Sequence, residues 1–175
     1  MTVPTLRPVP EILVTNDDGV DAPGLRALAG LGSVTVVAPA EESSAVSHAL
    51  TVRRPLELRA LDPGWYSVDG TPTDCVNVAV SQVLDREPDL VVTGINNGLN
   101  VGDDVTYSGT VAGALEGVLV GAPAIAASLQ RASRMDYNPA ATLLARLAAT
   151  VLSRGCRPGR CSTSMSHAAR IGASG

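Results

Sequence analysis

Short apolar runs alternate with longer amphipathic segments along most of the chain. Four runs are rich in aliphatic and β-branched side chains and stop abruptly at a polar or turn-forming residue, which is typical of buried parallel strands. These runs cover residues 11–15, 34–38, 89–95 and 124–128. Two shorter pieces, 56–58 and 65–68, alternate apolar and polar positions and indicate antiparallel or edge strands.

Helical periodicity fills most of the stretches between these runs. The predicted helices cover residues 23–30, 72–84, 108–120 and 140–151. The second has a clear start, because Thr71 can act as the N-cap, Pro72 can take the first helical position and Asp74 places a carboxylate in the first turn. The last helix repeats leucines on one face, as an amphipathic helix packed on a sheet would.

The order of these elements predicts the fold class. Strand, helix and strand follow one another within about 30 residues at the start, which favours a right-handed parallel crossover. We therefore expect a three-layer, Rossmann-like α/β domain with a mostly parallel sheet over residues 1–153. Residues 154–175 contain four Arg, no acidic residue and a single large aliphatic side chain, Ile171, so they predict a disordered tail outside the packed body.

Composition indicates the kind of core this domain has and the compartment in which it works. Residues of the set AVILMFWYC make up 45% of the 175 residues and Phe is absent, so the predicted core is aliphatic. No apolar run approaches the roughly 18 to 20 residues of a membrane-spanning helix, and the first ten residues lack the apolar stretch of a secretory signal. With only three cysteines, the sequence predicts a cytoplasmic protein without a disulfide framework.

The charged residues exclude several chemistries. All 13 basic residues are Arg, and the absence of Lys argues against a Walker A loop and a Schiff-base enzyme. With His48 and His167 as the two histidines, a three-His zinc site cannot form within one chain. The net charge of −4 disfavours binding to a nucleic-acid polymer.

Oxygen-bearing side chains follow three of the predicted strands. They are Asp17 and Asp18 after the first strand, Glu41, Glu42, Ser43 and Ser44 after the second, and Asn96, Asn97 and Asn100 after the third. Ligands of open parallel sheets bind at the carboxyl ends of the strands, so we expect these groups to meet. Carboxylate, hydroxyl and amide oxygens suit a hard cation such as Mg²⁺, Mn²⁺ or Ca²⁺. The alternative is that the Asp-Asp-Gly and Asn-Asn-Gly sequences only form turns.

A second candidate group lies at the predicted start of the helix after residue 108. Exposed amides of Ser108, Gly109 and Thr110 could hold an anion there. Glycines recur at every fourth position of this helix, which also fits a close approach to the sheet. His48 could donate to a phosphate oxygen or a leaving group, although a single His is more often structural. No G-x-G-x-x-G sequence follows the first strand, which weakens a dinucleotide-binding reading.

Five segments occur in an order that is typical of one family. They are ILVTNDDG at 12–19, VAP at 37–39 with Ser44, Ala45 and His48, GTPTDCV at 70–76, GINNGLN at 94–100, and YSGTVAGA at 107–114. Together they resemble the SurE family of metal-dependent 5′-nucleotidases. The resemblance implies a divalent cation, Mg²⁺ or Mn²⁺, held by Asp17, Asp18, Ser44 and Asn96. It also implies hydrolysis of nucleoside 5′-monophosphates, with 3′-monophosphates as a further option, and a homo-oligomer, a dimer or tetramer.

The resemblance also suggests roles around the reacting phosphate. Asp17 or Asp18 would orient the attacking water or accept its proton. Substrate-binding groups would be His48, Asn100, Ser108, Gly109 and Thr110, the last four stabilising the equatorial oxygens.

The sequence departs from the family after Val151 and Leu152, where its end looks truncated or frame-shifted. A remnant that binds metal or nucleotide without turnover is therefore the alternative function. A nicotinamide-dependent oxidoreductase would fit only the α/β pattern.

Overall fold

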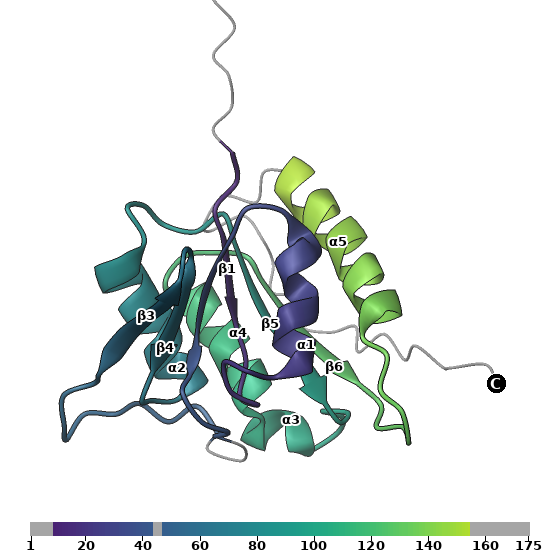
Figure 1. The fold of residues 1–175 in the computed structure, drawn as a ribbon, viewed down its shortest axis with the longest axis horizontal. Helices are drawn as coiled ribbons and strands as arrows, with labels where there is room; N and C mark the ends of the chain where they lie inside the picture. Colours follow the sequence, from purple (N-terminus) through teal and green to yellow (C-terminus); the bar gives the residue numbers. More distant parts are fainter. Residues whose placement is uncertain (1–8, 44–46, 155–175) are drawn as a thin grey trace, which may run out of the picture.

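The computed structural model describes residues 9–43 and 47–154, and six strands form one sheet in this part of the chain. The strands are β1 (Ile12–Thr15), β2 (Val34–Pro39), β3 (Leu58–Asp62), β4 (Trp65–Val68), β5 (Leu90–Asn97) and β6 (Ala124–Leu129). Their order across the sheet is β3-β4-β2-β1-β5-β6 (Figure 1). Every neighbouring pair is parallel except β3 with β4, so the mostly parallel sheet and the antiparallel edge pair are both confirmed.

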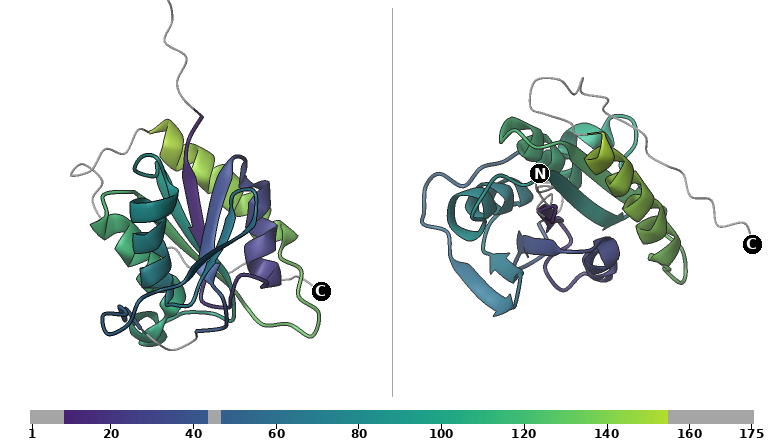
Figure 2. Two further views of the ribbon diagram at one scale, coloured as in Figure 1. Left: turned by 60° about the vertical axis from the view of Figure 1, so that its left-hand side comes forward. Right: turned by 90° about the horizontal axis from the view of Figure 1, so that it is seen from above.

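Helices cover both faces of the sheet and complete the predicted three layers (Figures 1 and 2). One face carries α1 (Pro23–Ala27), which continues into the 3-10 helix η1 (Leu28–Leu31), and α5 (Asn138–Ser153). The other face carries α2 (Pro72–Val78), which continues into the π-helical turn η2 (Ala79–Val83), and α4 (Gly109–Leu119). No helix among the described residues is both long and apolar enough to cross a lipid bilayer.

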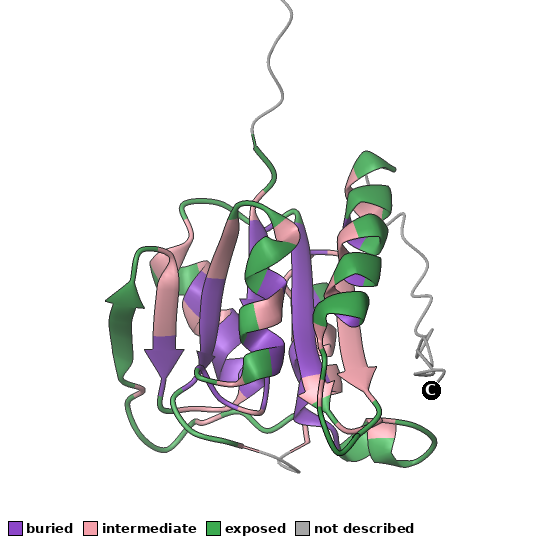
Figure 3. Cartoon of the chain, turned by 45° about the vertical axis from the view of Figure 1, so that its right-hand side comes forward, coloured by how far each residue is buried: buried purple, intermediate pink, exposed green. Residues whose placement is uncertain are grey.

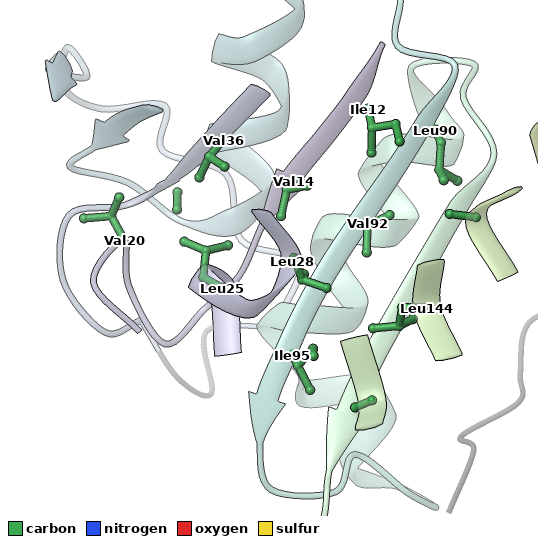
Figure 4. Packing of buried hydrophobic residues seen from close by; sticks show 13 residues of the cluster. Ile12, Val14, Val20, Leu25, Leu28, Val36, Leu90, Val92, Ile95 and Leu144 are labelled. Carbon is green, nitrogen blue, oxygen red and sulfur yellow. The ribbon is translucent and has the colours of Figure 1, made fainter. Parts of the chain in front are cut away.

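The period of two along the strands divides the core between these two faces. Val14, Val36 and Val92 are buried on the side of α1 and α5, where Leu25 and Leu144 pack against them (Figure 4). Their sequence neighbours in the same strands are buried on the side of α2 and α4. The central strands are buried over most of their length, whereas β3 is exposed throughout (Figure 3). The core is aliphatic, as composition predicted.

Helix α4 lies unusually close to the sheet because glycines line its inner face. A Cβ atom at Gly117 would lie 2.8 Å from Cβ of Val91 on β5, and one at Gly113 would lie 3.0 Å from Cγ2 of Thr93. One turn earlier, a Cβ at Gly109 would lie 2.8 Å from Cβ of Asp17. The glycines at every fourth position therefore allow close packing, and they bring the first turn of α4 against the end of β1.

The start of α2 agrees with its sequence prediction in detail. Thr71 is the N-cap, and its hydroxyl accepts a hydrogen bond from the Asp74 amide while the Asp74 carboxylate accepts one from the Thr71 amide. Asp74 is buried, and it also accepts a bond from the Thr51 amide. The Asp74 carboxylate thus connects the chain before β3 to this helix.

Three features differ from the sequence prediction. Strand β3 (Leu58–Asp62) shares only Leu58 with the predicted piece 56–58. Strand β5 continues through Asn96 and Asn97, which pair with Ser128 and Leu129 of β6 instead of following the strand. A short helix, α3 (Asp104–Tyr107), precedes α4 in a segment for which no element was predicted. Of the predicted tail, Arg154 is the C-cap of α5, and the rest lies outside the described residues.

Candidate active site

A cavity of about 410 Å³ opens at the carboxyl ends of β1 and β5. Residues from both strand ends, from the loop after β5, from α3 and from the loop after β6 line it. They are Asp17, Asp18, Asn96, Asn97, Gly98, Leu99, Asn100, Asp104, Tyr107, Ser108 and Arg131. The side chains selected from the sequence after β1 and β5 therefore do converge, because parallel neighbours end at the same edge of a sheet. Glu41, Glu42 and Ser43, which were selected after β2, are not among the lining residues.

Asp17 is buried, and both its carboxylate and its main chain are restrained. Its Oδ1 accepts a hydrogen bond of 2.5 Å from the Thr110 hydroxyl, and its main-chain oxygen accepts one of 2.8 Å from the Ser43 amide. Gly109 leaves just enough room for the side chain. The hydroxyl of Thr93 donates to the Thr110 carbonyl at 2.6 Å, which fixes the first turn of α4 to β5. Asp17 thus has little freedom to move away from the cavity.

Asp18 is only half-buried, and its carboxylate is less restrained. Its Oδ2 accepts a hydrogen bond of 3.1 Å from the Asn97 amide. Burial raises the pKa of Asp18 above its usual value; the bond from Asn97 opposes this shift, and the charges of Asp17 and Glu42 add to it. A cation in the cavity would favour the ionised form of Asp18.

The amide side chains beside the carboxylates offer further oxygen atoms. Asn96 donates from Nδ2 to the Gly98 carbonyl at 2.8 Å, which leaves its amide oxygen as the atom able to coordinate a cation. Asn16 donates in the same way to the Gly19 carbonyl. Within the described part of the chain, the buried Oδ1 of Asn16 and Oγ of Ser43 have no hydrogen-bond partner. Such orphaned oxygens are uncommon in protein interiors.

This set of donors fits a hard divalent cation. Asp17, Asp18 and Asn96 line one cavity, and all three present oxygen atoms, which Mg²⁺ and Mn²⁺ prefer. No group of three or more His, Cys, Asp and Glu side chains suited to a metal occurs among residues 9–43 and 47–154. Amide or hydroxyl oxygens would therefore have to complete the coordination.

The predicted phosphate-binding residues fall into two groups. Ser108 and Asn100 line the cavity; the Ser108 hydroxyl caps α4 by accepting a bond from the Val111 amide, and Nδ2 of Asn100 has no partner among the described residues. Gly109 and Thr110 are buried behind Asp17 and do not line the cavity. The Thr110 hydroxyl and the absence of a side chain at Gly109 position that carboxylate, which the sequence did not indicate.

His48 lies outside the residues that line the cavity. Its Nε2 is 2.7 Å from Oε2 of Glu116, which is about two turns beyond Ser108 on α4. Oε1 of the same carboxylate accepts a hydrogen bond of 2.8 Å from Nδ2 of Asn77 on α2. The imidazole is therefore engaged by a carboxylate on the helix face, and a role in substrate binding stays a prediction.

Ser44, the fourth predicted metal ligand, lies outside the described residues. The residues on either side of this gap are attached to the site. The Ser43 amide donates to Asp17, as above, and the Ser47 hydroxyl donates to the Thr106 carbonyl of α3 at 2.9 Å. Ser43 and Ser47 are therefore both hydrogen-bonded to residues at or beside the cavity.

Several lining residues were not selected from the sequence. Asp104 and Tyr107 belong to the unpredicted helix α3, and Leu99 lies in the preceding loop. Arg131 comes two residues after β6 ends, so the strand-end rule that found Asp17 could also have found it. An isolated Arg in a polar loop carries no pattern of its own.

Comparisons with known proteins agree with this geometry. The sequence matches the family described as Survival protein SurE over residues 12–168, a range that extends into the segment expected to depart from that family. A protein of Pelobacter propionicus named 5′-nucleotidase SurE is 57% identical over 149 residues, 82% of this chain and 60% of that protein. One of Geobacter sulfurreducens with the same name is 55% identical, over 82% of this chain and 57% of that protein.

A solved structure has the same fold. The crystal structure of a SurE protein from Aquifex aeolicus superposes with a TM-score of 0.79 at 43% identity, covering 84% of this chain and 62% of that one. The chain thus spans about 60% of the length of the curated relatives it matches.

Proposed function

This chain belongs to the Survival protein SurE family, and on that premise we propose that it hydrolyses nucleoside 5′-monophosphates to nucleoside and phosphate with the help of one divalent cation. The observation that carries the proposal is the meeting of Asp17, Asp18 and Asn96 with Ser108 at one cavity. The 5′-nucleotidase names of the relatives support the reaction class. Nucleoside 3′-monophosphates are a further candidate substrate.

Asp17, Asp18 and Asn96 would hold the cation, together with Ser44 if that residue completes the site. When bound, Mg²⁺ or Mn²⁺ would neutralise phosphate charge and lower the pKa of a coordinated water. The restraints on Asp17 from Thr110 and Gly109 keep one donor in place before a cation binds. Preorganisation of this kind reduces the loss of conformational freedom on binding.

The two carboxylates can also handle a proton. One oxygen of each accepts a hydrogen bond from the protein, Oδ1 of Asp17 from Thr110 and Oδ2 of Asp18 from Asn97. The second oxygen of either can orient the attacking water and accept its proton. We propose that one of these two residues is the base.

The beginning of α4 is suited to the phosphate. Ser108 lines the cavity as the N-cap of an eleven-residue helix, whose first amides and dipole favour an anion. The unpartnered amide nitrogen of Asn100 can donate to a phosphate oxygen from the other wall. Tyr107 is 64% exposed at the rim and, with Leu99, offers apolar surface to the nucleoside.

A second candidate function uses the same cavity, in which the chain would bind a cation and a nucleotide without turnover. We also propose that the protein forms a homo-oligomer and that it works in the cytoplasm. A negative net charge supports a small substrate over a nucleic-acid polymer.

The test is release of inorganic phosphate from each 5′-monophosphate, and from 3′-AMP, with Mg²⁺, with Mn²⁺ and with EDTA. Hydrolysis that needs the cation and is lost in Asp17→Asn supports the proposal. Asp85→Asn changes an exposed carboxylate that does not line the cavity, and it should leave the rate unchanged. Nucleotide binding by calorimetry without any phosphate release would select the non-catalytic alternative. No cation-dependent binding or hydrolysis would refute both.

A further inference from the structure

The cavity contains a marked imbalance of charge. Three carboxylates line it, those of Asp17, Asp18 and Asp104, and Arg131 is the one basic residue among its described lining. One divalent cation would offset two of the carboxylates, but a phosphate monoester brings up to two further negative charges. A site for such a substrate therefore needs another positive group.

The side chain of Arg131 is held over the cavity by the same residue that holds Asp18. Its Nε donates a hydrogen bond of 2.8 Å to the Asn97 carbonyl, and the Asn97 amide donates to Asp18. The Arg131 side chain lies beside Gly98, where a Cβ would be in van der Waals contact with it, 3.4 Å from Nε. Asn97 thereby fixes the spacing between the guanidinium group and the carboxylate.

The terminal nitrogens of Arg131 remain available. The bond to Asn97 uses Nε, and it is the only hydrogen bond that Arg131 makes within the described part of the chain. Arg131 is exposed as a residue although it lines the cavity, so a ligand can reach Nη1 and Nη2. A guanidinium anchored through Nε presents a planar pair of donors that matches two oxygens of a phosphate.

We infer that Arg131 is a substrate-binding residue that binds the phosphate of the nucleotide in this cavity. The inference concerns recognition in the site proposed above and rests on that function. Its chemical content is a bidentate contact from Nη1 and Nη2 to two phosphate oxygens, with Nε kept on Asn97. The other reading is that Arg131 only ties the loop after β6 to the end of β5 and, through Asn97, supports the position of Asp18.

Binding of inorganic phosphate in the presence of Mg²⁺, measured by calorimetry, separates these readings. We expect Arg131→Gln to weaken phosphate binding by about 10- to 100-fold, because a charge-assisted pair of hydrogen bonds is lost. Arg131→Lys keeps the charge but not the planar pair of donors, so its affinity for phosphate should lie between those of the unaltered chain and Arg131→Gln. The matched control is Arg134→Gln, which removes the same charge from an exposed position in the same loop that does not line the cavity.

Binding of Mg²⁺ alone gives a second readout. If Arg131 grips phosphate, Arg131→Gln keeps or raises the affinity for Mg²⁺, since a positive charge close to Asp18 is removed. If Arg131 only supports Asn97, the variant loses Mg²⁺ affinity together with thermal stability. That result, or an unchanged affinity for phosphate, would overturn the inference, as would an unaltered chain that binds no phosphate.

The same experiment separates this inference from the proposed function. An unaltered chain that binds phosphate through Arg131 but releases none from any nucleotide refutes the nucleotidase function and upholds the inference. Cation-dependent hydrolysis that is equally fast in Arg131→Gln, with equal phosphate affinity, upholds the function and refutes the inference.

Discussion

The hydroxyl of Thr110 donates a hydrogen bond of 2.5 Å to the carboxylate of Asp17, 93 positions away in the sequence. Both residues are buried, one at the start of α4 and the other just after β1. A hydrogen bond to a charged group contributes about 1.5–3 kcal/mol, and more is lost when the charge is left buried without a partner. This bond therefore connects the stability of the fold to the position of a candidate metal ligand.

Replacing Thr110 with Val should lower the free energy of unfolding by about 1.5–3 kcal/mol, because the shape is kept and the buried donor is removed. Urea denaturation measures the change. Thr150→Val is the control, since its hydroxyl bonds locally to the Arg146 carbonyl on an exposed helix face, and it should alter stability by no more than about 0.5 kcal/mol. Equal stability of the two variants would show that the bond contributes nothing.

Asp17→Asn should abolish the rise in melting temperature that Mg²⁺ or Mn²⁺ produces, while the apo protein melts at the same temperature or higher. The amide can still accept from Thr110, and repulsion with Asp18 is relieved. Differential scanning fluorimetry over a cation titration measures both effects. Asp85→Asn serves as the control. A full cation-induced shift in Asp17→Asn would contradict the assignment of Asp17 as a ligand.

The close packing of α4 makes Gly117 sensitive to a single methyl group. Gly117→Ala places a Cβ 2.8 Å from Val91, so either α4 or β5 must shift, and we expect a loss of about 1–3 kcal/mol in unfolding free energy. Gly30→Ala is matched in size and meets no atom within 4 Å, so it should be neutral or stabilising by up to about 1 kcal/mol. If both variants unfold alike, the glycines of α4 are not needed for close approach.

Asp89 predicts a pH-dependent contribution to stability. Its Oδ2 accepts bonds from Arg86 and from the Glu11 amide, joining the starts of β1 and β5, and the hydrogen bond from Arg86 is the main reason that the pKa of Asp89 is lowered. A lowered folded-state pKa stabilises the protein above the unfolded-state pKa, and this stability is lost as pH falls through the folded-state value.

Asp89→Asn should therefore unfold about 0.5–1 kcal/mol more easily than the unaltered chain at pH 7, a modest value because the pair is partly exposed. The difference should shrink as the pH falls below about 4. Urea denaturation between pH 3 and pH 7 tests this, and a difference that stays constant with pH would rule the ion pair out as its cause.

Cys75 should be unreactive in the folded protein. It lies on α2 and is buried in the core between this helix and the sheet, and burial raises the pKa of its thiol, so the thiolate is scarce at neutral pH. In a chain with Cys156→Ser and Cys161→Ser, a disulfide reagent should modify Cys75 only after denaturant is added. Rapid labelling without denaturant would mean that this side of the core opens readily.

Local patterns in the sequence predicted much of the fold. Strands β1, β2, β5 and β6 are found where apolar runs occur, and Thr71 and Asp74 form the capping arrangement that their spacing indicates. These features depend on residues only a few positions apart. The meeting of Asp17 and Asp18 with Asn96 also followed from sequence, because parallel strands end at one edge of the sheet.

Contacts between distant segments were not predictable in this way. The continuation of β5 through Asn97 depends on pairing with β6, and the partner of His48 depends on how α4 lies beside α2. Thr110 was expected at the phosphate, whereas its hydroxyl bonds to Asp17. Arg131 lines the cavity because its long side chain lies beside Gly98 and donates a hydrogen bond to the Asn97 carbonyl.

The sequence by itself determined the order of strands and helices, the aliphatic core and the oxygen-rich strand ends, since periodicity, capping and charge act over short stretches of chain. Tertiary structure decided which of those polar groups face the cavity and which support them from behind. The physical reason is distance. A hydrogen bond requires donor and acceptor to lie within about 3 Å, and packing of whole elements, above all of α4 on the sheet, sets separations at that scale.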